Sequence, residues 1–352
     1  EHEIGPTLKT LPSKYKVYCV LNACRDGTRA AIEALNLSNV EVIETAQPGK
    51  IRAVLLGAMK ARNSSFSHFL LLDDDIEWST LFPDIATYDK LAPITALPVV
   101  PTKEPANWLR ASQTLEYQIM CASKRAQANL GNVIMASGAA GIYRMDTFLS
   151  AMRDHDGEHI GDDLQCSYIH HVKGLKIDFV TEQVVRTKPP YSLKDWWKQR
   201  AKRWEVSPVF NLYWALRILF KRPGAGAGWH IRGVTLYRSL VIVNDLLRLV
   251  SFPLVLVFTP HVLVGVWGIT YVSVISKLLV FRFFFRKEDY ILWDKVMLSS
   301  VLTYPLYGSF MWVSRVYAFP KGIALNWRYY VKSRRSLNTL GSKFETLEKE
   351  LQ

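Results

Sequence analysis

The first half of the chain alternates short, mostly apolar runs with segments of helical periodicity. Residues 16–21, 40–43 and 69–72 are the short runs, whereas residues 28–35 and 50–62 carry apolar positions at helical spacing. Mostly apolar runs are typical of buried parallel strands, and the order strand, helix, strand, helix, strand predicts a doubly wound α/β sheet. Ligands of such a sheet bind at the carboxyl ends of its strands.

The same alternation continues to about residue 180. It predicts further strands at residues 92–99, 133–136 and 176–180 and further helices at residues 108–130 and 162–171. A tight loop is expected at Ser137-Gly138, where the small residues interrupt the pattern. These segments complete an α/β domain that we expect to end near residue 205.

Beyond Trp204 the chain becomes aromatic and aliphatic, and its charges collect at the ends of apolar runs. Residues 209–220 are predicted to form an amphipathic helix in a membrane interface. Residues 249–276 contain no Asp, Glu, Lys or Arg, and one membrane span takes about 20 residues. With residues 236–247 this stretch predicts two spans that turn near Pro260, and residues 291–319 are a third candidate span.

We therefore expect four parts. They are a cytosolic catalytic domain at residues 1–205, an interfacial helix with a Gly-rich linker at 206–232, two or three transmembrane helices at 233–320 and a basic tail at 321–352. Basic segments prefer the cytosol; two spans would place the tail there and three would place it outside, so the number of spans stays open. The expected location is the plasma membrane, as a multi-pass integral protein. The chain begins at Glu1, so spans upstream of it stay open as well.

Basic residues outnumber acidic ones, 44 to 31, for a formal net charge of +13. Such an excess suits nucleic acid, an anionic membrane face or a phosphorylated substrate. Here the basic residues flank apolar segments, which favours lipid headgroups and a sugar-nucleotide diphosphate and argues against nucleic acid. Four cysteines lie in the globular half without Cys-X-X-Cys spacing, and we interpret them as reduced thiols of a cytosolic domain.

Three adjacent carboxylates, Asp73-Asp74-Asp75, follow the apolar run at residues 69–72. Like charges repel, so the triplet needs a cation or basic partners to persist. In an extended segment Asp73 and Asp75 point to the same side, where a magnesium or manganese ion would hold a diphosphate between them. The alternative is a solvated acidic turn.

Two further constellations carry chemistry. Gly161-Asp162-Asp163 opens a predicted helix, where a carboxylate is either a helix cap or a general base that deprotonates a sugar hydroxyl. Residues 196–204, WWKQRAKRW, precede the membrane half. They form either an aromatic and basic interfacial belt or a site where Arg203 contacts a diphosphate and Trp204 offers its indole face to a sugar.

Asp245 and Arg248 stand inside an apolar stretch. Charges at membrane depth are costly and usually face a cavity or one another. Helical spacing places the two side chains on one face. They are therefore expected to form a mutual ion pair or to line a path for a translocated sugar chain.

The acidic and basic motifs, in this order, resemble those of the membrane-integrated family 2 glycosyltransferases, which include cellulose, chitin and hyaluronan synthases. The signature of that family is Asp-X-Asp after an apolar strand, then Thr/Gly-Glu/Asp-Asp, then Gln/Arg-X-X-Arg-Trp before membrane helices. Residues 73–75, 161–163 and 200–204 match it, and the resemblance covers about residues 16–320. Trp78 after the triplet and the SGAAGIYR loop at 137–144 are similar to the fungal capsule-type polysaccharide synthase group.

The resemblance implies a GT-A-like fold and a role for each matching residue. Asp75, with Asp73, would hold Mg or Mn and UDP, and Asp163 would be the catalytic base. Arg203 would bind the diphosphate and Trp204 would contact the acceptor. The other substrate-binding residues implied are Lys50 and Glu44 beside the nucleotide, Ser137 and Gly138 in the loop, and Arg200, which stands at the Gln position of the third motif.

The implied function is an inverting, UDP-sugar-dependent synthase that extends a β-linked polysaccharide and passes it through its own helices. Arg200 at the Gln position is also seen in ceramide glucosyltransferases, so transfer of one sugar to ceramide or a polyprenyl phosphate is the alternative. A catalytically inactive membrane scaffold is a second one. Expected partners are the UDP-sugar, the polysaccharide or lipid acceptor and membrane lipids, without nucleic acid; the sugar and a homo-oligomeric state stay open.

Overall fold

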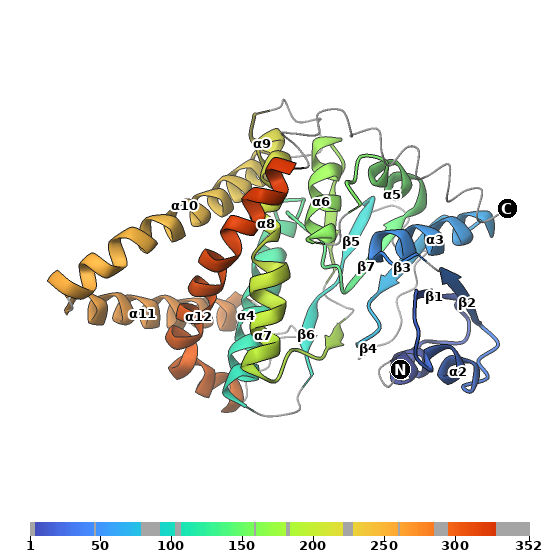
Figure 1. The fold of residues 1–352 in the computed structure, drawn as a ribbon, viewed down its shortest axis with the longest axis horizontal. Coiled ribbons are helices and arrows are strands. Elements are labelled where there is room, and N and C mark those ends of the chain that lie inside the picture. Colours follow the sequence, from blue (N-terminus) through green and yellow to red (C-terminus); the bar gives the residue numbers. More distant parts are fainter. Residues whose placement is uncertain are drawn as a thin grey trace.

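The computed structural model describes residues 4–45, 47–78, 92–102, 107–157, 160–180, 184–220, 228–259, 261–284 and 295–328 (Figure 1). An α/β part and a layer of three long helices lie side by side, with the long helices on the left of the view. The basic tail beyond residue 328 and the Gly-rich segment at 221–227 lie outside the described residues.

The N-terminal elements follow the sequence pattern closely. Strands β1 (Val17–Asn22) and β2 (Val40–Thr45) pair in parallel, with Val17 opposite Val40. Helix α2 (Thr28–Glu33) connects them, and α3 (Lys50–Asn63) follows β2. The strands and helices expected at residues 16–62 are therefore confirmed, with boundaries that differ by one or two residues.

The remaining strands form two more sheets, so the expectation of one doubly wound parallel sheet is wrong. The larger sheet has the order β3 (His68–Leu72), β7 (Ala140–Arg144), β5 (Ile94–Ala96), β8 (Ile177–Phe179), and β7 runs antiparallel to both of its neighbours. The third sheet has the order β4 (Ile76–Trp78), β9 (Val185–Thr187), β6 (Val99–Pro101). The fold is thus α/β with mixed sheets.

Two predicted strands differ from the structure. The run at 92–99 is split into β5 and β6 at Leu97-Pro98, where Pro98 has no N–H to donate and its carbonyl accepts from Val185 N–H. Residues 133–136 form no strand, although Val133 and Ile134 are buried. Their N–H groups donate instead to the Ile177 carbonyl and the Gln127 side chain. A short buried apolar run does not by itself distinguish a strand from a buried loop.

Four more helices surround these sheets: α1 (Ile4–Thr10), α4 (Trp108–Ala128), α5 (Met145–Met152) and α6 (Asp162–Val172). The Asn107 side chain caps α4 by accepting from Arg110 N–H. Apolar side chains of α3, α5 and the larger sheet form the main core, which includes Leu55, Ile94 and Phe148. This core holds the carboxyl end of β3 and the start of α6 in place.

The chain reaches the long helices through α7 (Leu193–Gln199), a π-helical turn (Arg200–Trp204), α8 (Ser207–Phe210) and α9 (Leu212–Phe220). The interfacial helix expected at 209–220 is therefore divided between α8 and α9. Phe210, Trp214 and Ile218 are buried in a cluster with residues of α6. Much of the apolar face of α8 and α9 thus packs against the α/β part.

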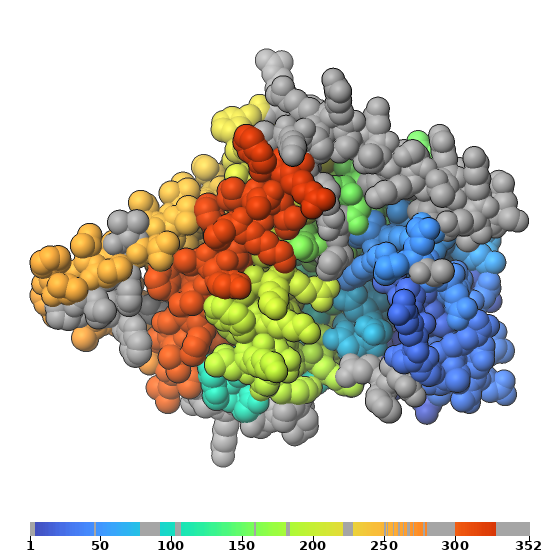
Figure 2. Space-filling model, in the orientation of Figure 1, coloured from blue at the N-terminus to red at the C-terminus, as the bar shows by residue number. Residues whose placement is uncertain are grey.

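The long helices are α10 (Trp229–Phe258), α11 (His261–Phe284) and α12 (Lys295–Asn326). The chain turns between α10 and α11, where the sequence predicts a turn. In the part of the chain that the structure describes, no helix combines the length and the apolarity needed to cross a membrane. In the space-filling view α10 extends away from the α/β part, whereas α12 lies against it (Figure 2).

Candidate functional site

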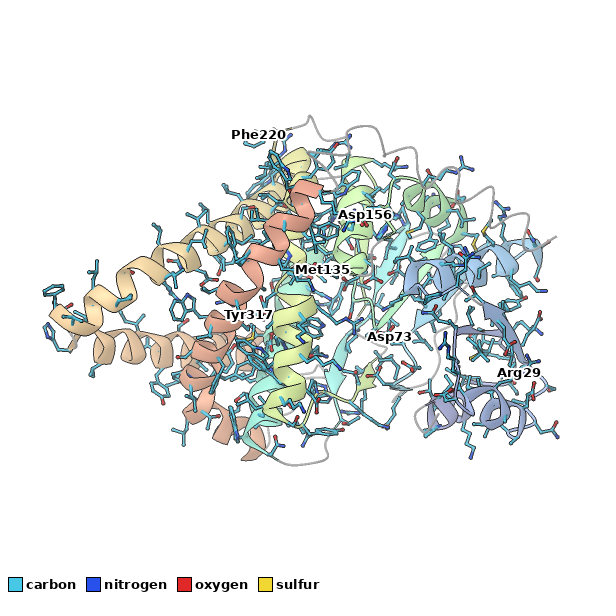
Figure 3. All side chains as sticks on the ribbon, viewed as in Figure 1. Arg29, Asp73, Met135, Asp156, Phe220 and Tyr317 are labelled. Carbon is cyan, nitrogen blue, oxygen red and sulfur yellow. The ribbon has the colours of Figure 1, made fainter. Side chains whose placement is uncertain are left out.

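The acidic triplet lies in the turn between β3 and β4, near the middle of the view in Figure 3. Asp73 N–H donates to the Ala139 carbonyl at 3.0 Å, and the Asp74 carbonyl accepts from the Thr7 hydroxyl at 2.7 Å. The Asp75 carboxylate accepts from the Thr187 hydroxyl of β9 at 3.1 Å. Three segments that are distant in the sequence therefore hold the triplet in a defined turn. A merely solvated acidic turn would not need these contacts.

Lys50 connects the triplet to the second acidic motif. Its Nζ lies 3.0 Å from Asp73 Oδ1 and 3.7 Å from Asp162 Oδ2. Burial alone would lower the pKa of Lys50, but the carboxylates of Asp162 and Asp73 outweigh it and hold that pKa above its usual range. Lys50 is the first residue of α3, so this helix delivers the ammonium group to the carboxyl end of β3.

The Ser137-Gly138 loop contacts Asp163. The carboxylate of Asp163 accepts from Gly138 N–H at 3.1 Å through Oδ2 and from Leu164 N–H at 2.8 Å through Oδ1. A Cβ at position 138 would lie 3.2 Å from Asp163 Cβ, so glycine permits this close approach. Ser137 pairs with Ala140 across the turn that precedes β7. The loop therefore sets the position of the Asp163 carboxylate.

Carboxylates outnumber cations in this cluster. Burial raises the pKa of Asp73 even though Lys50 opposes the shift, and burial with the neighbouring Asp73 charge raises the pKa of Asp75 to about 6. Burial also raises the pKa of Asp162. Crowded, partly desolvated carboxylates are stabilised by an added cation. Within the described residues no group of three or more carboxylate, imidazole or thiol side chains converges as a metal site.

The third motif lies close to the first motif and to the Ser137-Gly138 loop. Trp204 packs on an apolar cluster that contains Ile76, directly after the triplet, and Ala140, directly after the loop. Its ring lies 6.1 Å from that of Tyr117. Burial raises the pKa of Tyr117, the charge of Arg200 lowers it and that of Asp75 adds to the rise. Arg203 is exposed and has no ion-pair partner among the described residues. The structure thus brings together motifs that lie more than 80 residues apart.

Two residues predicted to contact the substrate, Arg200 and Glu44, each contact a charged side chain of the protein. Arg200 is buried, and its two terminal nitrogens donate to the Glu116 carboxylate at 2.7 and 2.6 Å. Both terminal nitrogens therefore contact a protein carboxylate, and direct substrate binding by Arg200 stays a prediction. Glu44 ends β2 as an exposed side chain that pairs with Arg29 at 2.9 Å, and its role beside a nucleotide stays a prediction.

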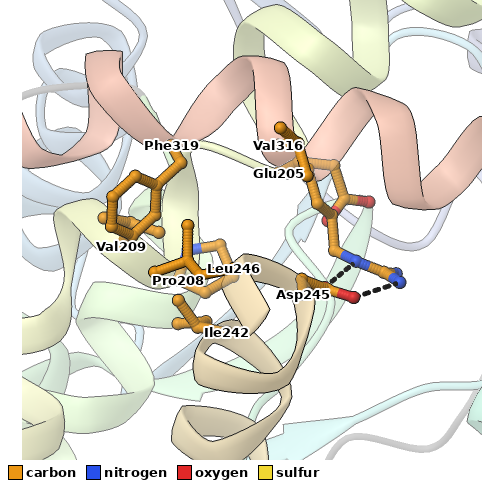
Figure 4. A pocket seen from close by; sticks show the side chains of 9 residues that line it. Glu205, Pro208, Val209, Ile242, Asp245, Leu246, Val316 and Phe319 are labelled. Atoms are coloured by element: carbon orange, nitrogen blue, oxygen red, sulfur yellow. Dashed lines mark hydrogen bonds and ion pairs between the residues drawn. The ribbon is translucent and has the colours of Figure 1, made fainter. Parts of the chain in front are cut away.

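The expected pair between Asp245 and Arg248 is wrong. Asp245 of α10 pairs with Arg315 of α12 at 2.5 Å, and Arg248 is exposed. The Asp245–Arg315 pair borders a small recess between α8, α10 and α12, whose lining is otherwise mostly apolar (Figure 4). The recess contains Val209, Ile242 and Phe319, side chains that offer no hydrogen bonds to a sugar.

Sequence reasoning missed several residues of the site. Asp162 belongs to the second motif but was assigned no role, whereas it faces Lys50. Thr187, which holds Asp75, and Glu116, which holds Arg200, belong to no motif. Only the tertiary fold identifies these two, because their partners lie 112 and 84 residues away along the chain.

Gly161 is required by the geometry of the second motif. It has φ +68°, and a Cβ there would lie 1.7 Å from the Ser207 hydroxyl oxygen. We expect Gly161→Ala to lower the free energy of unfolding by about 3 kcal/mol, from overpacking together with backbone strain. Gly131→Ala is the matched control, because Gly131 has φ +90° but nothing within 4 Å of its Cβ position. Equal losses of stability in urea titrations of the two variants would contradict this account.

Comparisons with known proteins identify a family and a fold for the chain. A family model described as "Glycosyltransferase like family 2" matches residues 8–206. A mannosyltransferase from Pyrobaculum calidifontis, solved with GDP-Man and Mn2+, is similar at 13% identity and a TM-score of 0.52, over 92% of this chain and 83% of that one. GalNAc-T7 with UDP, GalNAc and Mn2+ is similar at 16% identity and a TM-score of 0.38, over 54% of this chain and 41% of that one. The sequences of curated proteins contain no match. The similarity to the mannosyltransferase shows a GT-A-like α/β fold.

Proposed function

The chain belongs to the glycosyltransferase like family 2, and we propose that it is an inverting enzyme that transfers a sugar from UDP to an acceptor hydroxyl. The observation that carries the proposal is the convergence of Lys50, Asp73 and Asp162, with Asp163 held beside them by Gly138. A buried structural ion pair needs one carboxylate for its lysine, whereas this cluster has five aspartates and a single lysine. Such an excess of carboxylates suits a site for a metal-bound diphosphate.

Asp163 is the catalytic base in this proposal. As the acceptor oxygen forms a bond to the anomeric carbon, its proton passes to the Asp163 carboxylate. The bond between the anomeric carbon and the diphosphate oxygen breaks, and UDP leaves with the electron pair. Attack from the face opposite UDP inverts the anomeric configuration. The N–H groups of Gly138 and Leu164 hold the carboxylate in one orientation throughout.

The donor diphosphate belongs beside Asp73 and Asp75. Their hard carboxylate oxygens fit Mg or Mn, which commonly takes one or two protein carboxylates and completes its shell with phosphates and water. A bound divalent cation would supply charge neutralisation for the leaving diphosphate. Exposed Arg203 adds a positive charge that has no competing carboxylate among the described residues. Lys50 is engaged by Asp73 and Asp162 and so helps to keep the two acidic motifs together.

The acceptor belongs on the Trp204 side of the site. The half-buried indole packs on the apolar cluster that contains Ile76 and Ala140, so Trp204 lies close to the triplet and to the Ser137-Gly138 loop. Flat indole faces suit the apolar faces of sugar rings. We propose a growing β-linked polysaccharide as the acceptor, with its translocation through the helical layer.

The rival is transfer of one sugar to a lipid. Arg200, which stands at the Gln position of the third motif, is the feature that favours this rival. Sizing of the radiolabelled product separates the two. Polymer of many sugars is expected, and a glycolipid as the sole product would overturn the polysaccharide proposal while leaving the transferase intact.

We further propose that the three long helices associate with a membrane, with the catalytic part on the cytosolic face of the plasma membrane. Large apolar side chains are exposed along α10, α11 and α12. They include Leu247 at 64%, Phe258 at 75%, Val264 at 75% and Leu302 at 72% exposure. Exposed apolar area on this scale marks an interaction surface.

Flotation with phosphatidylcholine vesicles tests this association. Each apolar side chain contributes about 1.5–3 kcal/mol on burial, so the double variant Leu247→Glu with Phe258→Glu is expected to lower the bound fraction at least about tenfold. Leu130→Glu is the control, because Leu130 is 61% exposed on the α/β part. Equal flotation of the double variant and the control would contradict membrane binding through these helices.

A further inference from the structure

The Trp204 ring contacts Arg200, which belongs to the same motif. The guanidinium carbon of Arg200 lies 4.1 Å from the centroid of the Trp204 ring, a stacked cation–π contact. Arg200 is 2% exposed, so its place is set by what it contacts inside the protein. Both residues belong to the π-helical turn, a geometry often found at functional sites.

Glu116 of α4 holds Arg200 in that stacked position. The carboxylate accepts from both terminal nitrogens of the guanidinium, a bidentate arrangement that fixes the plane of the group as well as its distance. Glu205 offers a second carboxylate at 3.9 Å from the same guanidinium. The plane of Arg200, and with it the position of the Trp204 indole, therefore depends on Glu116.

The chain of contacts continues to the long helix α12. The Tyr307 hydroxyl donates to Glu116 Oε2 at 2.5 Å and accepts from Trp196 Nε1 at 3.2 Å. Tyr307 is 1% exposed, and its ring packs edge-on against Trp196. The Tyr307 hydroxyl of α12 thus orients the Glu116 carboxylate. That carboxylate in turn orients the Arg200 guanidinium, which lies against the Trp204 indole.

We propose that Glu116 and Tyr307 are positioning residues of the acceptor site, acting through Arg200 on Trp204. The inference rests on the proposed role of Trp204 as the surface that receives the acceptor. It assigns α12 a part in acceptor binding, although its Tyr307 lies 191 residues from Glu116 and in a different part of the fold. It also explains the Arg at position 200, since a bidentate, stacked contact needs a planar guanidinium and not an ammonium or an amide.

A kinetic comparison of two tyrosines of α12 tests the proposal. Tyr307→Phe keeps the ring and removes the hydroxyl that contacts Glu116. Tyr304→Phe is the matched control, because the Tyr304 ring lies 5.9 Å from that of Tyr307 in a tilted arrangement, while the hydroxyl that contacts Glu116 is that of Tyr307. We expect Tyr307→Phe and Glu116→Gln to raise the KM for the acceptor about tenfold, the loss of one charged hydrogen bond. Acceptor-independent release of UDP and the KM for the donor should stay within twofold of the unsubstituted enzyme.

A loss of UDP release in proportion to the loss of transfer would overturn the proposal, because it would show general damage to the fold. An unchanged KM for the acceptor in both variants would overturn it as well. If the unsubstituted protein releases UDP from no sugar donor, the proposed function fails. The positioning contact is then judged by a measurement that needs no activity.

That measurement is the fluorine resonance of Trp204 in protein labelled with 5-fluorotryptophan. The chain has 11 tryptophans, and Trp204→Phe identifies the resonance by its absence. Tyr307→Phe is expected to shift and broaden the Trp204 resonance, whereas Tyr304→Phe leaves it in place. An unchanged Trp204 resonance in both Tyr307→Phe and Glu116→Gln would show that neither residue positions the indole.

Discussion

Replacing Asp163 by Asn is expected to lower sugar transfer about a thousandfold, the usual contribution of a general base. The amide oxygen can still accept from Gly138 N–H, so the loop keeps that contact, whereas the Leu164 N–H loses its side-chain acceptor. The amide cannot take up the acceptor proton. Transfer is measured as labelled product formed per minute, and donor binding by calorimetry should be unchanged.

Asp146→Asn is the matched control for this variant. Asp146, like Asp163, lies in the first turn of a helix, but it is exposed and pairs with Arg144 on the surface. Its substitution should leave the rate within twofold. Retention of full transfer by Asp163→Asn would remove Asp163 from the role of base, and Asp162 would be the next carboxylate to replace.

The second large effect is expected at Asp75. Asp75→Asn removes a predicted metal ligand while its amide still reaches the Thr187 hydroxyl. We expect the rate to fall about a hundredfold and the divalent cation concentration for half-maximal activity to rise more than tenfold, because metal ligands dominate such affinities. The measurement is a titration of Mn and Mg at saturating donor.

Asp74→Asn provides the comparison within the same triplet. Asp74 is exposed, and its backbone carbonyl accepts a hydrogen bond from the Thr7 hydroxyl. This variant should retain most of the activity and its response to the cation. Equal losses in Asp74→Asn and Asp75→Asn would mean that the net charge of the triplet matters rather than the carboxylate at position 75.

The local order of strands and helices near the site could be predicted because each element carries its own periodicity. The apolar run before Asp73 and the helical spacing after Lys50 are both local patterns. The arrangement of the sheets could not be predicted. Antiparallel β7 between β3 and β5 depends on long-range pairing, and the loss of a strand at 133–136 depends on N–H groups finding partners in Gln127 and Ile177.

The residues of the site likewise fall into those that the sequence could identify and those that it could not. Asp73, Asp75, Asp163 and Trp204 stand in motifs whose order resembles that of a known family, so they could be named from the sequence. The contacts of Arg200 could not, since its partner Glu116 lies 84 residues away on α4. A buried ion pair leaves no periodic signal in either segment. The same holds for Asp245, whose partner is Arg315 on another helix and not Arg248 on its own.

Lys50 gives the clearest link between sequence and chemistry. The family resemblance implies a place for Lys50 beside the nucleotide, and the structure places its ammonium group between Asp73 and Asp162. In this position Lys50 offsets part of the repulsion between the two acidic motifs. The cluster keeps an excess of carboxylates, which is the condition under which a divalent cation and a diphosphate bind together.

The anomeric configuration of the product tests the central claim most directly. The full chain is incubated with each UDP-sugar and Mn or Mg, and the linkage formed is determined by NMR and by linkage-specific hydrolases. The account predicts UDP release from at least one α-linked UDP-sugar with a β-linked product, and loss of both in Asp163→Asn. An α-linked product, or UDP release from none of the donors, would contradict it.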